Sequence, residues 1–383
     1  MRVGMLGGTT SSLVASVRER SWRSFDVQLF LYVVLLIAFG VVMGYSASFN
    51  DAAAGEVLPQ TVKTVIWAGI GLTIFFVVAS VDYHWLETLT APLYLVVLGL
   101  LLLTLAAGTQ LFGAQMSITV AGLDFQFSEV CKVLMIVVLA SWLTGRRERI
   151  GRLSTIVGAA VLMALPTFLV FRQPDLGTAL VFVAILVGML FMSGASLGWM
   201  GVLAGAVVGA APVAVSLLHD YQRQRLFCFL DPYADAQGAC YQLVQALTAV
   251  GSGGWFGQGL TAGRQNQLGH LPVQSTDFIF TVVAEELGFV GGLVVLALFA
   301  LLLWRILLIG WQSRDALGSM VAVGLASMIL FQILVNVGMV LGIMPVTGIP
   351  LPFITYGGSS LISLLFGMGI LESVRMRSHK TTF

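Results

Sequence analysis

The feature that most constrains this chain is the presence of long runs without a charged residue. Segment 176–218 contains no Asp, Glu, Lys or Arg over 43 residues, and segment 316–371 contains none over 56 residues. A helix rises about 1.5 Å per residue and the hydrocarbon core of a bilayer is about 30 Å thick, so either run is at least twice as long as one span. Each run therefore predicts two membrane helices. The first run is expected to turn near Ser193–Gly198, and the second around Pro345, Pro350 and Pro352.

Six further apolar segments are each long enough for one span: Val27–Asn50, Thr64–Val81, Ala91–Ala107, Phe127–Thr144, Leu153–Phe171 and Thr276–Ile309. Only 10% of the residues are charged and 58% are hydrophobic, whereas soluble proteins carry about 25% charged residues. This composition excludes a soluble enzyme, a disordered protein and a collagen-like fibre. The sequence predicts an all-α polytopic membrane protein with about ten transmembrane helices.

The distribution of basic residues predicts the orientation. If the N-terminus is cytoplasmic, 13 of the 19 Lys and Arg residues fall on the cytoplasmic side, as the positive-inside rule requires. We therefore expect both termini in the cytoplasm and a large extracytoplasmic loop between helices seven and eight. The predicted segments are a basic tail (1–25), helices one to seven (26–218), the loop (219–275), helices eight to ten (276–372) and a second cytoplasmic tail (373–383).

Several kinds of site are excluded or left open. The net charge of +1 predicts no nucleic-acid partner. The chain has no zinc-type Cys/His spacing, no Walker lysine motif and no hydrolase signature. Cys228 and Cys240 share the loop, and we expect two free thiols there. A disulfide is the alternative if the loop faces an oxidising compartment.

Ionisable residues in or beside membrane segments suggest function, because burying charge in a bilayer is costly. Glu129 and Lys132 are spaced i,i+3 and are expected to pair on one helix face. They either neutralise each other, with Ser128 capping the helix, or bind substrate. Asp175 has the position of a helix N-cap, with Arg172 as its counter-ion.

Asp277 begins the eighth predicted helix, near the outer surface. It either compensates the helix dipole or carries out chemistry. On an ideal helix Glu285 lies within about 80° of its face, whereas Glu286 lies about 180° away. A helix with three carboxylates at this depth is expected to line a polar cavity or contact protein.

Arg223, Arg225 and Arg264 form a basic set in the extracytoplasmic loop. They are either solvated or bind a lipid-linked phosphate. The second interpretation makes the loop part of a binding site for anionic lipid headgroups.

Taken together, these residues resemble the SEDS (shape, elongation, division and sporulation) family of bacterial cell-wall polymerases, more its RodA branch than its FtsW branch. The segments that carry the resemblance are 128–132, 172–178, 229–232, 241–242, 251–254, 271–272, 276–280, 284–289 and 336–360. Val273 and Ser275 depart from the family pattern, which has Glu and His there. The resemblance implies a multi-pass protein of the bacterial inner (cytoplasmic) membrane. It further implies a peptidoglycan glycosyltransferase that polymerises lipid II into glycan strands at the outer face of that membrane, for cell elongation and shape. It also implies an undecaprenyl-pyrophosphate-linked glycan product and a class B penicillin-binding transpeptidase as partner.

The same resemblance makes Asp277 the essential acid. We expect it to act as the base for the acceptor hydroxyl, with Arg223, Arg225, Lys132 and Arg264 neutralising the pyrophosphate. Glu129 and Glu285 are further candidate substrate contacts. A divalent cation (Mg²⁺ or Mn²⁺), shared by Asp277 and Glu129, is an additional possibility; no other cofactor and no resident protein-bound metal is expected.

Two other functions remain open from the sequence. A lipid II flippase would place charges along a path through the membrane midplane, and Glu285 and Glu286 are the best evidence for it. A non-catalytic scaffold for a transpeptidase would not need Asp277.

Overall fold

The computed structural model describes residues 22–49, 58–111, 114–120, 123–216, 218, 220–238, 240–267 and 277–378. Most of the predicted N-terminal tail therefore lies outside the described residues. So do the last part of the predicted loop (268–275), the first residue of predicted helix eight (276) and the last five residues of the C-terminal tail.

Eight helices are long and apolar enough to cross a membrane: α2 (Val27–Ala47), α4 (Leu58–Ser80), α6 (Thr90–Ala107), α7 (Phe127–Thr144), α8 (Leu153–Arg172), α14 (Ile279–Gln312), α15 (Ala316–Val340) and α16 (Gly358–Ser378). Two further apolar helices are α9 (Leu176–Met192) and α10 (Leu197–Ser216). Within the described residues these ten helices confirm the predicted multi-pass helical fold. The turn between α9 and α10 begins at Ser193, as predicted, and α16 continues to Ser378, beyond the predicted boundary at 372.

The centre of the bundle consists of α7, α15 and α16, most of whose residues are buried. Small residues let these helices approach closely: a Cβ atom on Gly324 of α15 would lie 2.4 Å from the Ile136 side chain of α7. The helices α2, α4, α6, α8 and α10 surround this centre and expose Val, Leu and Phe side chains, such as Val161 and Val208. An apolar surface of this kind is suited to contact with lipid tails.

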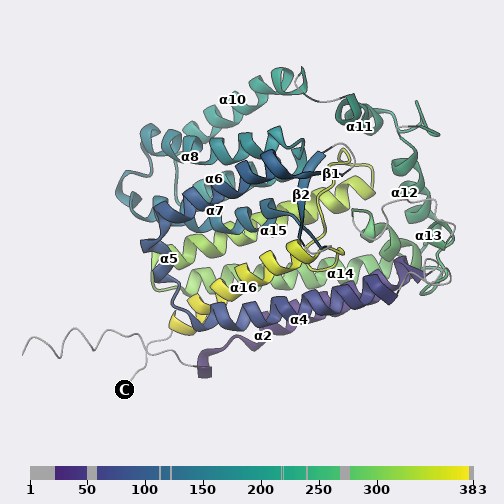
Figure 1. Cartoon of the computed structure of the whole chain (residues 1–383), viewed down its shortest axis with the longest axis horizontal. Coiled ribbons are helices and arrows are strands. Elements are labelled where there is room, and N and C mark those ends of the chain that lie inside the picture. Colours follow the sequence, from purple (N-terminus) through teal and green to yellow (C-terminus); the bar gives the residue numbers. More distant parts are fainter. Residues whose placement is uncertain are drawn as a thin grey trace, which may run out of the picture.

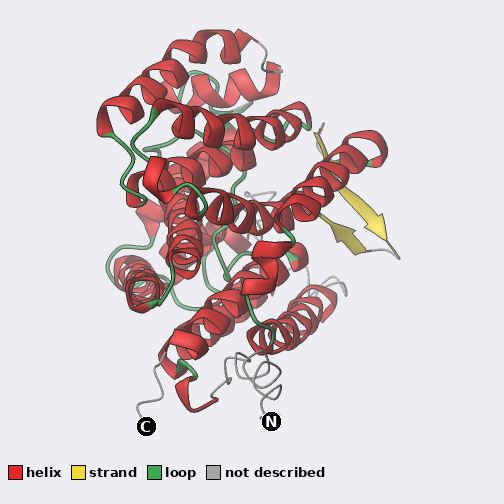
Figure 2. Ribbon diagram, turned by 90° about the vertical axis from the view of Figure 1, so that its left-hand side faces the viewer, coloured by secondary structure: helices red, strands yellow, loops and turns green. Residues whose placement is uncertain are grey.

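The shorter elements gather mainly at one end of the bundle (Figure 1). The described part of the predicted loop contains α11 (Asp220–Leu230), α12 (Tyr241–Ser252) and α13 (Arg264–Gln267). The sequence analysis did not predict the small antiparallel sheet of β1 (Thr109–Leu111), β2 (Ala114–Val120) and β3 (Leu123–Phe125). Figure 2 shows this sheet at the margin of the helices.

Helix α14 is broken at Gly288, which has φ +67° and ψ −163°. The connection between α12 and α13 fills the break: the amides of Gln258 and Gly259 donate to the carbonyls of Glu285 and Glu286, each at 3.0 Å. The amide of Phe289 donates in turn to the Gly254 carbonyl at 2.9 Å. Because these bonds replace helical ones, the break leaves those backbone groups paired.

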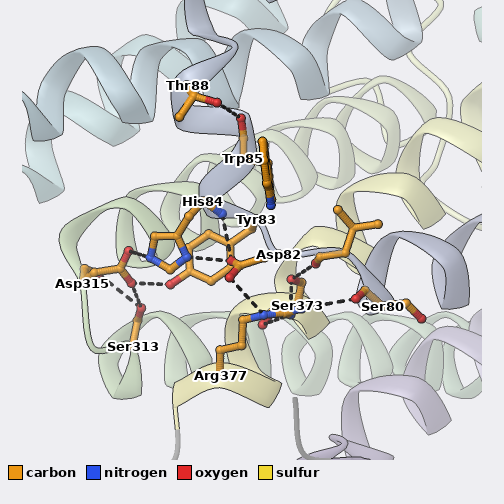
Figure 3. A network of polar contacts seen from close by, with 11 residues as sticks. Ser80, Asp82, Tyr83, His84, Trp85, Thr88, Ser313, Asp315, Ser373 and Arg377 are labelled. Atoms are coloured by element: carbon orange, nitrogen blue, oxygen red, sulfur yellow. Dashed lines mark hydrogen bonds and ion pairs between the residues drawn. The ribbon is translucent and has the colours of Figure 1, made fainter. Parts of the chain in front are cut away.

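A polar network closes the other end of the bundle (Figure 3). His84, which begins α5 (His84–Thr88), lies between Asp82 and Asp315, with ring nitrogen–oxygen distances of 2.7 and 3.2 Å. Arg377 of α16 donates to Ser373 Oγ at 2.6 Å and lies 3.6 Å from Asp82. The network joins the end of α4, the α14–α15 turn and α16, far along α14 from Asp277.

Candidate active site

Asp277 lies two residues before α14 and is partly exposed. Its backbone carbonyl accepts a hydrogen bond of 2.9 Å from Asn336 Nδ2 of α15. Its carboxylate faces the connection between α15 and α16, where a Cβ atom on Gly348 would lie 3.3 Å from Asp277 Oδ2. Asp277 is therefore held by the end of α15 and by the α15–α16 connection, which lie 59 or more residues further along the chain.

Two charged side chains act on Asp277 from other elements. Burial raises the pKa of Asp277 to about 6, the positive charge of Arg225 opposes this rise, and the negative charge of Asp175 adds to it. Arg225 comes from α11, where its guanidinium lies 5.8 Å from the centre of the Tyr221 ring. Of the three arginines predicted to bind phosphate, Arg225 is thus the one whose charge acts on Asp277.

Helix α11 is fixed against the turn between α8 and α9. The Tyr221 hydroxyl and Gln222 Nε2 both donate to the carbonyl of Pro174, at 3.3 and 3.0 Å. The next residue, Asp175, caps α9 by accepting from the Thr178 amide at 2.9 Å, as predicted. Among the described residues no ion pair joins Asp175 to Arg172; the charges that act on Asp175 are those of Lys132 and Glu129.

Glu129 and Lys132 form the predicted i,i+3 ion pair on the first turns of α7, with Nζ 2.7 Å from Oε1. Both side chains are almost fully buried, at 2% and 1% exposure. The predicted cap is wrong: α7 begins at Phe127 after Gln126, and the hydroxyl of Ser128 is buried without a partner. The charges of Lys132 and Glu129 act on Asp175, and the charge of Asp175 acts on Asp277.

The other two arginines lie differently from Arg225. Arg223 donates to the carbonyls of Val215 and Ser216, at 3.1 and 2.5 Å, and so closes the C-terminal end of α10. Arg264 begins α13 with an exposed side chain. No contact brings either of them to the carboxylate of Asp277 within the described parts of the chain.

Glu285 and Glu286 hold the α12–α13 connection onto α14. Glu285 accepts from the backbone amides of Gln265 and Asn266 at 2.8 and 3.2 Å. Glu286 accepts from Ser46 Oγ at 2.5 Å and from Asn266 Nδ2 at 3.1 Å. Since both carboxylates have structural partners, they give no support to a charged path across the membrane.

The prediction of two free thiols is wrong, because Cys228 and Cys240 form a disulfide. The turns that follow α11 fold the chain back, so that the two Cα atoms lie 5.2 Å apart at a sequence separation of 12. The bond ties the end of α11 to the start of α12. It thereby restrains the helix that carries Arg225.

The sequence analysis also missed Tyr221, Gly348 and the role of Asn336. Asn336 was the easiest to detect, because a carboxamide is unusual in a long apolar run. The described residues contain no group of three or more His, Cys, Asp or Glu side chains that could hold a metal ion. A cation site built by Asp277 and Glu129 alone does not fit, because Glu129 is paired with Lys132.

Comparisons with known proteins agree on one family. The family model of FtsW, RodA and SpoVE, described as a cell cycle protein, matches residues 27–380. Stage V sporulation protein E of Bacillus subtilis is 38% identical over 91% of this chain and 96% of its own length. Peptidoglycan glycosyltransferase MrdB of Escherichia coli K12 is 37% identical over 92% of this chain and 95% of its own length.

A solved structure has the same fold. It is a chain of a peptidoglycan synthase complex, studied for the coordination of polymerization and crosslinking, and it superposes with a TM-score of 0.80 at 32% identity. The match covers 94% of this chain and 100% of that chain.

Proposed function

We propose, from the premise that this chain belongs to the FtsW, RodA and SpoVE family and is a peptidoglycan glycosyltransferase, that it polymerises lipid II at the outer face of the inner membrane. The observation that carries the proposal is the partly exposed carboxylate of Asp277, which faces the α15–α16 connection at the end of the bundle that holds α11–α13 and on which the positive charge of Arg225 acts. A transfer from a sugar pyrophosphate needs a base for the acceptor hydroxyl and a cation for the leaving group at the same site.

In the proposed reaction, Asp277 takes the proton of the C4 hydroxyl of the acceptor sugar. The hydroxyl oxygen attacks C1 of the donor sugar, and the bond from C1 to the polyprenyl pyrophosphate breaks with its electron pair on the leaving group. Direct attack inverts the configuration at C1. Arg225 is positioned to neutralise the pyrophosphate, whereas Arg223 is occupied by the end of α10. The exposed Arg264 remains a candidate for headgroup contacts.

The rate of polymerisation is expected to fall in acid. Because burial raises the pKa of Asp277 to about 6, half of the carboxyl groups are protonated near that pH, and a protonated carboxyl cannot act as the base. Measuring initial rates on labelled lipid II across this range should give an acidic limb with a midpoint near pH 6. A rate that stayed constant down to the ordinary carboxyl pKa of 3.8 would contradict the role of Asp277.

We further propose that a divalent cation enters the reaction with the pyrophosphate, because Mg²⁺ is commonly held by substrate phosphates together with few protein ligands. Chelation with EDTA is then expected to slow polymerisation, and Mg²⁺ or Mn²⁺ to restore it. Unchanged rates at high EDTA would show that the cationic side chains suffice.

We propose that α11–α13 are extracytoplasmic and that both termini are cytoplasmic. The Cys228–Cys240 disulfide supports this orientation, since disulfides persist in oxidising compartments. In a Cys131→Ser background, a membrane-impermeant maleimide should label intact spheroplasts only after mild reduction. Labelling without reduction would contradict the disulfide, and labelling only after the membrane is opened would reverse the orientation.

We propose a class B penicillin-binding transpeptidase as the partner, supported by the similarity to a chain of a peptidoglycan synthase complex. The membrane lipids would contact the apolar side chains that α2, α4, α6, α8 and α10 expose.

The deciding experiment supplies lipid II only to the outer face of liposomes that contain the purified chain. Glycan strands on a gel are the expected result, because a polymerase acting at that face needs no translocation. A flippase or a scaffold would produce no strands under these conditions, and this outcome would overturn the proposed function.

A further inference from the structure

Asn336 lies in the last turns of α15 and is fully buried. Its side-chain amide donates two hydrogen bonds, one of 2.9 Å to the carbonyl of Asp277 and one of 2.7 Å to the carbonyl of Ile349. A carboxamide NH₂ group has two N–H donors, and both are used here. Asn336 therefore joins two backbone positions that are 72 residues apart in the chain.

Both of those positions belong to the active site. The Asp277 carbonyl does not accept the helical hydrogen bond from the Thr281 amide, because that amide donates to the Phe278 carbonyl instead. Ile349 follows Gly348, the residue whose Cα faces the Asp277 carboxylate and whose φ is +74°. The side-chain amide of Asn336 thus fixes the distance between the Asp277 backbone and residues 347–349, which lie opposite the Asp277 carboxylate.

The same segment is fixed from a second side. A Cβ atom on Gly177 of α9 would lie 2.7 Å from the Thr347 carbonyl, so the connection packs directly on the start of α9. Asp175, whose charge acts on Asp277, caps that helix. With α9 on one side and Asn336 on the other, the position of residues 347–349 relative to Asp277 depends on the two donated hydrogen bonds.

We propose that Asn336 is a positioning residue for glycosyl transfer, holding the Asp277 backbone and the 347–349 segment in the geometry in which the carboxylate meets the acceptor hydroxyl. This inference rests on the proposed function, in which Asp277 is the base. It assigns to Asn336 a role in the rate of the chemical step rather than in substrate affinity.

The test is Asn336→Leu in the full-length protein, with Gln332→Met as the matched control. Gln332 lies one turn earlier in α15, is equally buried, and makes no hydrogen bond to Asp277. A displacement of about 1 Å in a catalytic group can cost about 100-fold in rate. We expect Asn336→Leu to lower kcat 10- to 100-fold, as an order of magnitude, with KM for lipid II changed less than about threefold.

A second readout separates positioning from a general structural defect. Released from the 347–349 segment, the carboxylate becomes more hydrated, so the acidic limb of the rate profile should move to lower pH in Asn336→Leu and stay in place in Gln332→Met. If Asn336→Leu does not fold, Gly348→Ala changes the same geometry from the loop side, because its Cβ atom would lie 3.3 Å from Asp277 Oδ2, and it should also lower kcat.

The outcomes are distinguishable. The inference is overturned if Asn336→Leu has the wild-type kcat and an unmoved acidic limb while Asp277→Asn is inactive. Where Asn336→Leu does not fold, the same result in Gly348→Ala overturns it. Equal losses in Asn336→Leu and Gln332→Met would also overturn it, since a shared defect is structural. If Asp277→Asn itself polymerises lipid II, the proposed role of Asp277 fails first.

Discussion

Replacing Asp277 by Asn is expected to abolish polymerisation of labelled lipid II while leaving the fold intact. The substitution keeps the size of the side chain and removes the carboxylate on which the positive charge of Arg225 acts. General base catalysis contributes about 10²- to 10⁴-fold, so the loss should exceed the sensitivity of a gel assay. The measurement is the length distribution of glycan strands made by purified protein.

Asp220→Asn is a suitable control, because Asp220 is an exposed carboxylate at the start of α11 on the same end of the bundle. This variant should make strands at the wild-type rate, and both variants should have the wild-type melting temperature. Strand synthesis by Asp277→Asn would show that another group accepts the proton.

The fold could be predicted largely from charge-free runs, since each run must be buried in lipid or protein. The small sheet and the break in α14 could not, and the disulfide was only the alternative to two free thiols. Gly288, for example, has an unusual backbone conformation because the chain around Trp255–Gly257 packs against it: a Cβ atom there would lie 2.3 Å from the Gly257 amide nitrogen. Such a contact leaves no periodic signal in the sequence.

The candidate site was partly predictable for a related reason. Asp277, Arg225 and the Glu129–Lys132 pair stand out as charges beside apolar segments, and the structure connects them electrostatically. Glu285 stands out equally but is turned toward Gln265 and Asn266. The angular argument assumed one regular helix from Asp277 to Glu285, whereas Asp277 lies before the helix begins.

The second large expected effect is a loss of stability when the buried Glu129–Lys132 ion pair is broken. Lys132→Met should lower the free energy of unfolding by about 3–5 kcal/mol, because it leaves a buried carboxylate without its cation. The 2.7 Å ion pair is almost fully buried, so water cannot take the place of Lys132. Thermal unfolding in detergent, followed by intrinsic fluorescence, measures this loss.

The double variant Glu129→Gln with Lys132→Met removes both charges and should regain most of that stability, since replacing a buried pair as a whole is often close to neutral. Its activity then separates the two interpretations that the sequence left open. Because the charges of Lys132 and Glu129 act on Asp175, and that of Asp175 acts on Asp277, we expect a stable protein that polymerises lipid II about tenfold more slowly, a cost of about 1.4 kcal/mol in the barrier. Wild-type polymerisation by the stable double variant would mean that the pair serves the fold alone.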